Sequence, residues 1–352
     1  LKDTGGNRLM QRALAVSLLC VAIAGTQLST ATAADVDTDN SSSAAVAVPV
    51  TVNVPIRTID TPGTSGQGGI VEIRVGKSAP FAVMLDTGSV GLRVFPGAWE
   101  RKPGSVKLGA KKIATALAGS KVKGIVGRAT VTLNGVTTAL PVPFQYVNTT
   151  NPSIQQWTES KIFGILGIGT GSGDLTNPLM AMPGNLGVSW SVHFERNISD
   201  RIGRLGSLVL GGQAPPETIM VFQSPFVGKN INGALLWNDH ASNGCWRFGV
   251  KPEWCGNTWF DSGGTKMRVI GRVFARLPQG ANGMLRQGTR VEFAAPGSAY
   301  VGHRFVSGDQ ASRNYVRVLP KGAGVVNTGN SFYFDYTVSY NVAIGKIYLS
   351  KS

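Results

Sequence analysis

The sequence contains two copies of one short pattern: an apolar run that ends in Asp, then a small hydroxyl residue and Gly. The first copy follows the apolar residues 81–85 and continues as Asp-Thr-Gly-Ser from Asp86. The second follows Trp259 and Phe260 and continues as Asp-Ser-Gly-Gly from Asp261. A buried strand that ends on a lone carboxylate is costly unless the carboxylate has partners. Two copies therefore predict two similar lobes, each of which delivers one carboxylate to a shared site.

The composition favours a chain built from strands. Of the 352 residues 46 are Gly, and only 15% are charged, which is typical of many short strands joined by turns. A hydrophobic content of 42% is enough for a large core. We place the two lobes at residues 67–213 and 214–352.

The N-terminal part has the features of a signal peptide and a linker. Within residues 1–33, a basic start at 10–12 precedes an apolar run too short to span a membrane, and Ala-Thr-Ala at 31–33 fits a cleavage site. Residues 34–66 begin as a polar, low-complexity segment and are expected to form a flexible linker, in which residues 46–56 add an edge strand. The mature protein is expected to be secreted, without a membrane span.

Glycine-bounded strands follow the two Asp motifs in a characteristic order. Residues 163–169 and 206–212 follow the first motif, and residues 325–330 follow the second. Residues 124–133 form a further expected strand, which ends in an Asn-Gly hairpin turn. With the two motifs, this order resembles the pepsin-like aspartic proteases over about residues 67–350. The resemblance implies an all-β, bilobal fold with the active site in the cleft between the lobes.

The resemblance assigns the chemistry to the two motif carboxylates. Asp86 and Asp261 would form a catalytic dyad, in which the charged carboxylate takes a proton from water and the protonated one donates to the developing oxyanion. The implied function is a secreted endopeptidase that cuts polypeptides as a monomer. This chemistry requires no cofactor and no metal.

The resemblance also implies supporting roles around the dyad. Two hydroxyls would bond the backbone of the opposite loop, two glycines would present backbone amides, and a third hydroxyl would hold the outer oxygen of Asp86. These residues are Thr87 and Ser262, Gly88 and Gly263, and Ser89.

Three positions depart from the family pattern. Gly264 stands where most members have Ser or Thr, so Asp261 loses one hydrogen bond unless Thr265 or water replaces it. The Tyr of the flap, a hairpin that closes over substrate, is missing, and its position falls at about Leu117. Arg93 stands where a Trp usually supports that Tyr. These departures leave open a non-catalytic binding protein on the same scaffold.

The second motif also resembles the loop around a trypsin-type nucleophile, which would make Ser262 the catalytic residue of a serine protease. However, Phe260 replaces the first Gly of that loop. The three histidines, His193, His240 and His303, do not occur early in the chain in the sequence context that such enzymes have. We therefore favour the aspartic mechanism.

The cysteines and the charge indicate the environment of the protein. Cys245 and Cys255 lie outside the expected signal peptide, and in an exported chain they predict a disulfide rather than a metal site, which needs more ligands. The formal net charge of +15 allows association with anionic wall polymers or lipid surfaces. Because no basic run is interleaved with aromatic residues, we expect no nucleic-acid groove.

Among bacterial proteins, the sequence most resembles the pepsin-like proteases attached to mycobacterial PE proteins. Those proteases also carry Asp-Ser-Gly-Gly at the second site. In this sequence, the expected signal peptide stands where those proteins carry the PE module.

Overall fold

The computed structural model describes residues 50–352 except 65, 100–101, 118–119, 150, 197–202, 213–214, 216, 299–301 and 309–313. Val48–Ser352 forms one compact unit. The expected signal peptide and the first part of the expected linker lie outside the described residues. Among the described residues, no helix is both long and apolar enough to cross a bilayer.

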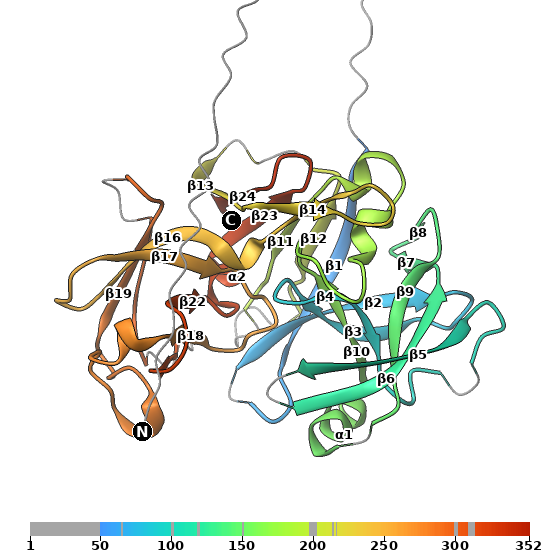
Figure 1. Cartoon of the computed structure of the whole chain (residues 1–352), viewed down its shortest axis with the longest axis horizontal. Coiled ribbons are helices and arrows are strands. Elements are labelled where there is room, and N and C mark those ends of the chain that lie inside the picture. The colour runs from blue at the N-terminus through green and yellow to red at the C-terminus, as the bar shows by residue number, and fades with distance from the viewer. Residues whose placement is uncertain are drawn as a thin grey trace, which may run out of the picture. The chain divides into compact units, whose positions relative to one another are not determined.

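Strands dominate the structure, and its larger sheet takes strands from both halves of the chain (Figure 1). The strand order is β13-β24-β23-β11-β12-β1-β2-β3-β10-β4-β9-β6-β5, and β7 pairs with β2 and β8. The bounds are β1 Val52–Asp60, β2 Gln67–Val75, β3 Phe81–Asp86, β4 Val90–Val94, β5 Lys107–Leu117, β6 Ser120–Ala129, β7 Val131–Leu133, β8 Val136–Thr137, β9 Val142–Val147, β10 Ile162–Ile168, β11 Ser189–His193, β12 Gly206–Leu210, β13 Thr218–Gln223, β23 Tyr336–Asn341 and β24 Lys346–Lys351. The two expected lobes therefore share one sheet.

The smaller sheet is built from the second half of the chain, in the order β20-β19-β16-β17-β22-β18-β21, and β14 and β15 form a separate hairpin. The bounds are β14 Phe226–Lys229, β15 Leu235–Trp237, β16 Ser242–Phe248, β17 Trp254–Trp259, β18 Met267–Ile270, β19 Arg290–Ala294, β20 His303–Val306, β21 Val316–Leu319 and β22 Val325–Asn327. The helices are α1 Pro152–Glu159 and α2 Ser331–Asp335, with short 3₁₀ turns η1 Pro178–Ala181, η2 Gly184–Gly187, η3 Asp239–Ala241, η4 Arg272–Phe274 and η5 Ala281–Gly283.

The same three-strand arrangement surrounds each Asp motif. β10 lies between β3 and β4, parallel to the first and antiparallel to the second. β22 lies in the same way between β17 and β18. Each Asp motif connects the two outer strands of its set. The repeat in the sequence thus corresponds to a repeat in the fold.

The burial pattern of the strands that lead to the first motif explains why these strands form. In β2, the buried Val71, Ile73 and Val75 alternate with the exposed Glu72 and Arg74, which is the two-residue period of a strand with one face in the core. The next strand, β3, is buried at almost every position because it lies inside the sheet. The chain is therefore held on both sides where it reaches the motif.

The prediction of a flexible linker over residues 34–66 is wrong for its second part. Residues 52–60 form β1, which pairs with β12 on one side and with β2 on the other, so this strand is also not the edge strand expected over 46–56. Its alternating Val54 and Ile56 are buried, so one face of this strand packs against the core. The strand expected at 124–133 is split into the end of β6 and β7.

Candidate active site

Asp86 is the last residue of β3 and is 9% exposed. Two donors in the following turn hold its carboxylate: the Gly88 amide donates to Oδ1 at 2.8 Å and the Ser89 hydroxyl donates to Oδ2 at 2.6 Å. Hydrogen bonds of this kind stabilise a buried charged carboxylate. The first motif therefore supplies the partners of its own Asp.

Asp261 follows β17 and is 6% exposed. Its Oδ1 accepts the amides of Gly263 at 3.1 Å and Gly264 at 3.0 Å. Its Oδ2 accepts the side-chain amide of Asn327 at 2.6 Å. The second carboxylate thus has three donors where the first has two, and one of the three comes from a distant strand.

Sequence reasoning missed Asn327. We expected the absence of a hydroxyl at Gly264 to cost Asp261 a hydrogen bond, and Asn327 at the end of β22 supplies one instead. The Asn327 side chain is fully buried, and its Oδ1 accepts the Gly329 amide at 2.8 Å. A polar side chain at the end of a Val-Val strand was the available signal, because a buried amide needs partners.

The structure brings the two carboxylates together at the two motif glycines. A Cβ built on Gly88 would lie 2.2 Å from Oδ1 of Asp261 and 3.0 Å from Oδ1 of Asp86, so these oxygens are separated by no more than the sum of the two distances. A Cβ on Gly263 would lie 2.5 Å from Oδ1 of Asp86. Any side chain at either position would therefore clash with the carboxylate of the opposite loop.

This proximity has an electrostatic consequence. The pKa of Asp261 is raised to about 7, first because burial penalises its charged form and then because the charge of Asp86 lies nearby. The Asn327 hydrogen bond, the charge of Arg268 and the Gly264 amide act in the opposite direction, in decreasing order. Asp261 therefore keeps its proton at acidic pH.

Hydrogen bonds between Thr87 and Ser262 join the two loops. The Thr87 amide donates to the Ser262 hydroxyl at 2.9 Å, and the Ser262 amide donates to the Thr87 hydroxyl at 2.8 Å. In addition, the Thr87 hydroxyl donates to the Phe260 carbonyl at 2.9 Å, and the Ser262 hydroxyl donates to the Leu85 carbonyl at 3.0 Å. Each loop is thus fixed to the strand end of the other.

Two buried tyrosines extend this connection and were also missed from the sequence. The Tyr333 hydroxyl, from α2, lies 2.7 Å from the Thr87 hydroxyl and 2.7 Å from the Tyr340 hydroxyl. Because the only hydroxyl proton of Thr87 is donated to Phe260, Tyr333 is the donor to Thr87. Burial raises the pKa of Tyr333, so it remains a neutral donor.

Both carboxylates line a cavity of about 200 Å³. One wall is apolar and comes from the first half of the chain: Met84, Phe95, Val122, Ile154, Trp157 and Ile165. The second half of the chain contributes Trp259, Gly264 and Arg268 to the lining. An apolar wall beside a few convergent polar groups is typical of a ligand site.

The β5–β6 hairpin contributes Ala116 and Val122 to the cavity. Leu117 ends β5 and pairs with Ser120, but its side chain and the turn at 118–119 lie outside the described residues. The assignment of Leu117 to a flap therefore stays a prediction.

Arg93 does not contact a flap residue in the hydrogen bonds described; its hydrogen bonds support the first Asp loop. Its guanidinium is buried and donates to the carbonyls of Val90 at 3.2 Å and Gly91 at 3.1 Å. The same nitrogen lies 3.5 Å from the Ser89 hydroxyl, which in turn bonds Asp86. Burial lowers the pKa of Arg93 and the nearby charge of Asp86 raises it.

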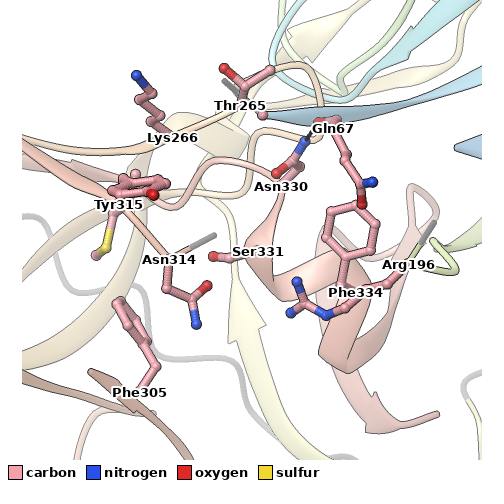
Figure 2. Close-up of a pocket in the computed structure, with 12 residues that line it drawn as sticks. Gln67, Arg196, Thr265, Lys266, Phe305, Asn314, Tyr315, Asn330, Ser331 and Phe334 are labelled. Carbon is pink, nitrogen blue, oxygen red and sulfur yellow. Dashed lines mark hydrogen bonds between the residues drawn. The ribbon is translucent and has the colours of Figure 1, made fainter. Parts of the chain in front are cut away.

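A second pocket is lined by residues from both halves of the chain (Figure 2). Gln67, Lys266, Tyr315 and Phe334 are among its lining residues, and the two carboxylates are not. Its volume of about 20 Å³ has room for a water molecule but not for a peptide side chain. The candidate site is the cavity at Asp86 and Asp261, because both carboxylates line it.

The remaining predicted residues are placed as follows. The Ser262 hydroxyl is fully buried and bonds two backbone groups, whereas a nucleophile must face substrate. Cys245 and Cys255 form the predicted disulfide, which joins paired positions of β16 and β17. Glu253 lies near the two sulfurs, but bonded cysteines have no thiolate with which to bind a metal.

The fold matches that of known aspartic proteinases. The solved structure of an aspartic proteinase from Irpex lacteus superposes with a TM-score of 0.57 at 15% sequence identity, over 86% of this chain and 98% of that one. No family model matches the sequence, and no curated protein matches it. The chain therefore has the pepsin-like aspartic proteinase fold that the sequence resemblance implied.

Proposed function

We propose that the protein is an aspartic endopeptidase, in which Asp86 and Asp261 share one proton and activate a water molecule. The observation that carries the proposal is the meeting of the two buried carboxylates at Gly88 and Gly263, on the wall of one cavity. Two carboxylates this close do not both ionise readily, so one retains a proton near neutral pH. The raised pKa of Asp261 supports its assignment as the protonated member.

The proposed reaction depends on the different protonation states of Asp86 and Asp261. Asp86 accepts a proton from a water molecule while the water oxygen bonds to the scissile carbonyl carbon, and Asp261 gives its proton to the carbonyl oxygen. The resulting intermediate collapses when the leaving nitrogen takes the proton from Asp86 and the C–N bond breaks. Asp261 recovers a proton from the hydroxyl that becomes the new carboxyl group. The dyad thus returns to its starting state without a covalent intermediate.

The remaining features support an exported enzyme that acts on polypeptides. A disulfide is typical of an oxidising compartment, which is consistent with removal of residues 1–33 as a signal peptide. We propose that residues 67–213 and 214–352 act as the two lobes, with the cavity between them. The apolar wall around Trp157 would hold a side chain next to the scissile bond.

Digestion of a diverse peptide mixture between about pH 3 and 8 tests the proposal. We expect cleavage by the wild type and by a surface control, Asp174→Asn, whose side chain is 65% exposed. Asp86→Asn and Asp261→Asn should lose most of the cleavage although they remain folded by circular dichroism. Cleavage by both of these variants would contradict the dyad, and peptide binding by the wild type without cleavage would indicate a binding protein.

A further inference from the structure

Two arginines, Arg268 and Arg317, are paired on the adjacent strands β18 and β21, and Arg268 lines the cavity of the dyad. We propose that they form a cationic subsite that selects substrates with acidic side chains close to the scissile bond, on the side that lies over β18. This inference rests on the proposed peptidase function, and it adds a substrate class to that function.

The strand register places Arg268 on the side of Asp261. Arg268 lies directly opposite Asn327 in the antiparallel pair β18–β22, and directly opposite residues project from the same face of a sheet. The Asn327 side chain reaches the Asp261 carboxylate at 2.6 Å. Accordingly, Arg268 lines the same cavity as the dyad, and its charge acts on Asp261.

Arg317 continues the row on the next strand. It is paired with Arg268 in the parallel pair β18–β21, where neighbouring strands lie about 4.8 Å apart. In both strands the flanking residues are buried, namely Met267 and Val269 in β18 and Val316 and Val318 in β21. The two arginines therefore share the face that is not in the core, and Arg317 is exposed there.

The charge of Arg268 acts on Asp261, but among the described residues neither arginine forms a direct ion pair with a carboxylate. None of the ion pairs found among the described residues includes Arg268 or Arg317. Like charges on adjacent strands destabilise a sheet. Two paired guanidinium groups without a direct ion-pair partner among the described residues, one of them at the wall of the candidate site, are therefore better explained by an anionic ligand than by the stability of the fold.

Other arginines of the same sheet show the contrast. Arg247, Arg290 and Arg304, on β16, β19 and β20, all lie within 3.3 Å of the carboxylate of Glu292. Each of these arginines therefore has a direct carboxylate partner, which Arg268 and Arg317 lack among the described residues. Nearer the row, Lys266 stands over the ring of Tyr315, at 6.0 Å from its centre (Figure 2).

The chemistry of the subsite favours a carboxylate. A guanidinium binds a carboxylate through two parallel hydrogen bonds between opposite charges. The side-chain amide of a substrate Gln or Asn carries no charge and binds more weakly. Arg268 is nearer to Asp261 along the row, so it should act on the substrate position closer to the scissile bond. Arg317 should act on a position farther out and more weakly, because it is more exposed to solvent.

Matched Glu and Gln peptides with amidated C-termini test the subsite. The wild type should cleave the Glu peptide with a kcat/KM on the order of tenfold higher than the Gln peptide, which corresponds to about 1.4 kcal/mol. The ratio of the two kcat/KM values should fall to about one in Arg268→Gln and should fall partly in Arg317→Gln. It should be unchanged in the control Arg57→Gln, because Arg57 is an exposed residue of β1. A preference that appears only with a free C-terminal carboxylate would instead indicate recognition of the chain end and overturn the side-chain subsite.

Binding separates this proposal from the proposed peptidase function. Asp86→Asn should bind the Glu peptide about tenfold more tightly than the Gln peptide, and the added substitution Arg268→Gln should abolish the difference. If the wild type cleaves nothing while this difference is present, the peptidase function is wrong and the subsite stands. Equal cleavage and equal binding of the two peptides would overturn the subsite.

Discussion

The two Asp loops share a backbone arrangement but obtain their side-chain support differently. In the first loop, the Ser89 hydroxyl three residues after Asp86 holds Oδ2. In the second, the donor to Oδ2 of Asp261 is Asn327, 66 residues farther along the chain. The first carboxylate is therefore positioned by its own turn, whereas the second depends on the insertion of β22 between β17 and β18.

This difference matters because the two carboxylates are assigned different protonation states. Asp261 is the member with the raised pKa, and Asn327 is the first of the groups that lower it. The distant donor thus adjusts the pKa of the proposed acid as well as its position. A local hydroxyl and a distant amide are not interchangeable supports in this account.

The largest expected effect comes from removing either carboxylate. Asp86→Asn and Asp261→Asn should each lower kcat/KM by roughly 10²–10⁴-fold, because each removes one of the two proton transfers. Steady-state kinetics on a single peptide measures both variants. If one of them retained nearly the full rate, the two loops would differ far more than we propose, and one carboxylate would suffice for the reaction.

The next effect concerns the hydrogen bonds between the loops. Ser262→Ala should lower the free energy of unfolding by roughly 1–3 kcal/mol, because it leaves the Thr87 amide without its acceptor in a buried place, and cleavage should remain. Thr87→Val should cost more, because the Thr87 hydroxyl also serves Phe260 and Tyr333.

Denaturant unfolding and the cleavage rate should be measured on the same samples of both variants. A Ser262→Ala protein with unchanged stability and no activity, beside an active Asp86→Asn, would favour the serine mechanism. Equal losses of stability in the two variants would show that the tyrosine contact adds nothing.

The smallest expected effect is a difference in pH dependence between variants of the two side-chain donors, Asn327 and Ser89. Asn327→Ala removes a hydrogen bond that lowers the pKa of Asp261, so the loss of activity at alkaline pH should move to higher pH. Ser89→Ala should reduce the rate severalfold and leave the position of that loss unchanged, since Ser89 bonds the other carboxylate. The pH dependence of kcat/KM for both variants decides the matter, and equal shifts would remove the distinction between the loops.

Much of this arrangement was accessible from the sequence, because it depends on local patterns. An apolar run before Asp and a glycine after it predict a buried strand and a tight turn, and the order of the glycine-bounded strands indicated the fold. The disulfide between Cys245 and Cys255 was also predicted and is confirmed. These features need only neighbouring residues or a count of cysteines.

The rest depends on contacts between distant parts of the chain. β1 looked like part of a linker because its partners, β2 and β12, include a strand about 150 positions away. Asn327 and Tyr333 carry no local motif, and their roles arise only when β22 and α2 are packed behind the loops. The positions of Arg268 opposite Arg317 and opposite Asn327 are likewise visible only once the strands are placed side by side.

The pH dependence of kcat/KM in the wild type tests the unequal dyad most directly. The proposed mechanism needs the proton on Asp261, so the rate should fall as the pH rises through about 7, where that proton is lost. A mechanism with Ser262 and a neutral histidine as general base predicts the opposite, a rate that rises over the same range. A falling profile that is absent in Asp261→Asn supports the account, and a rising profile in the wild type would contradict it.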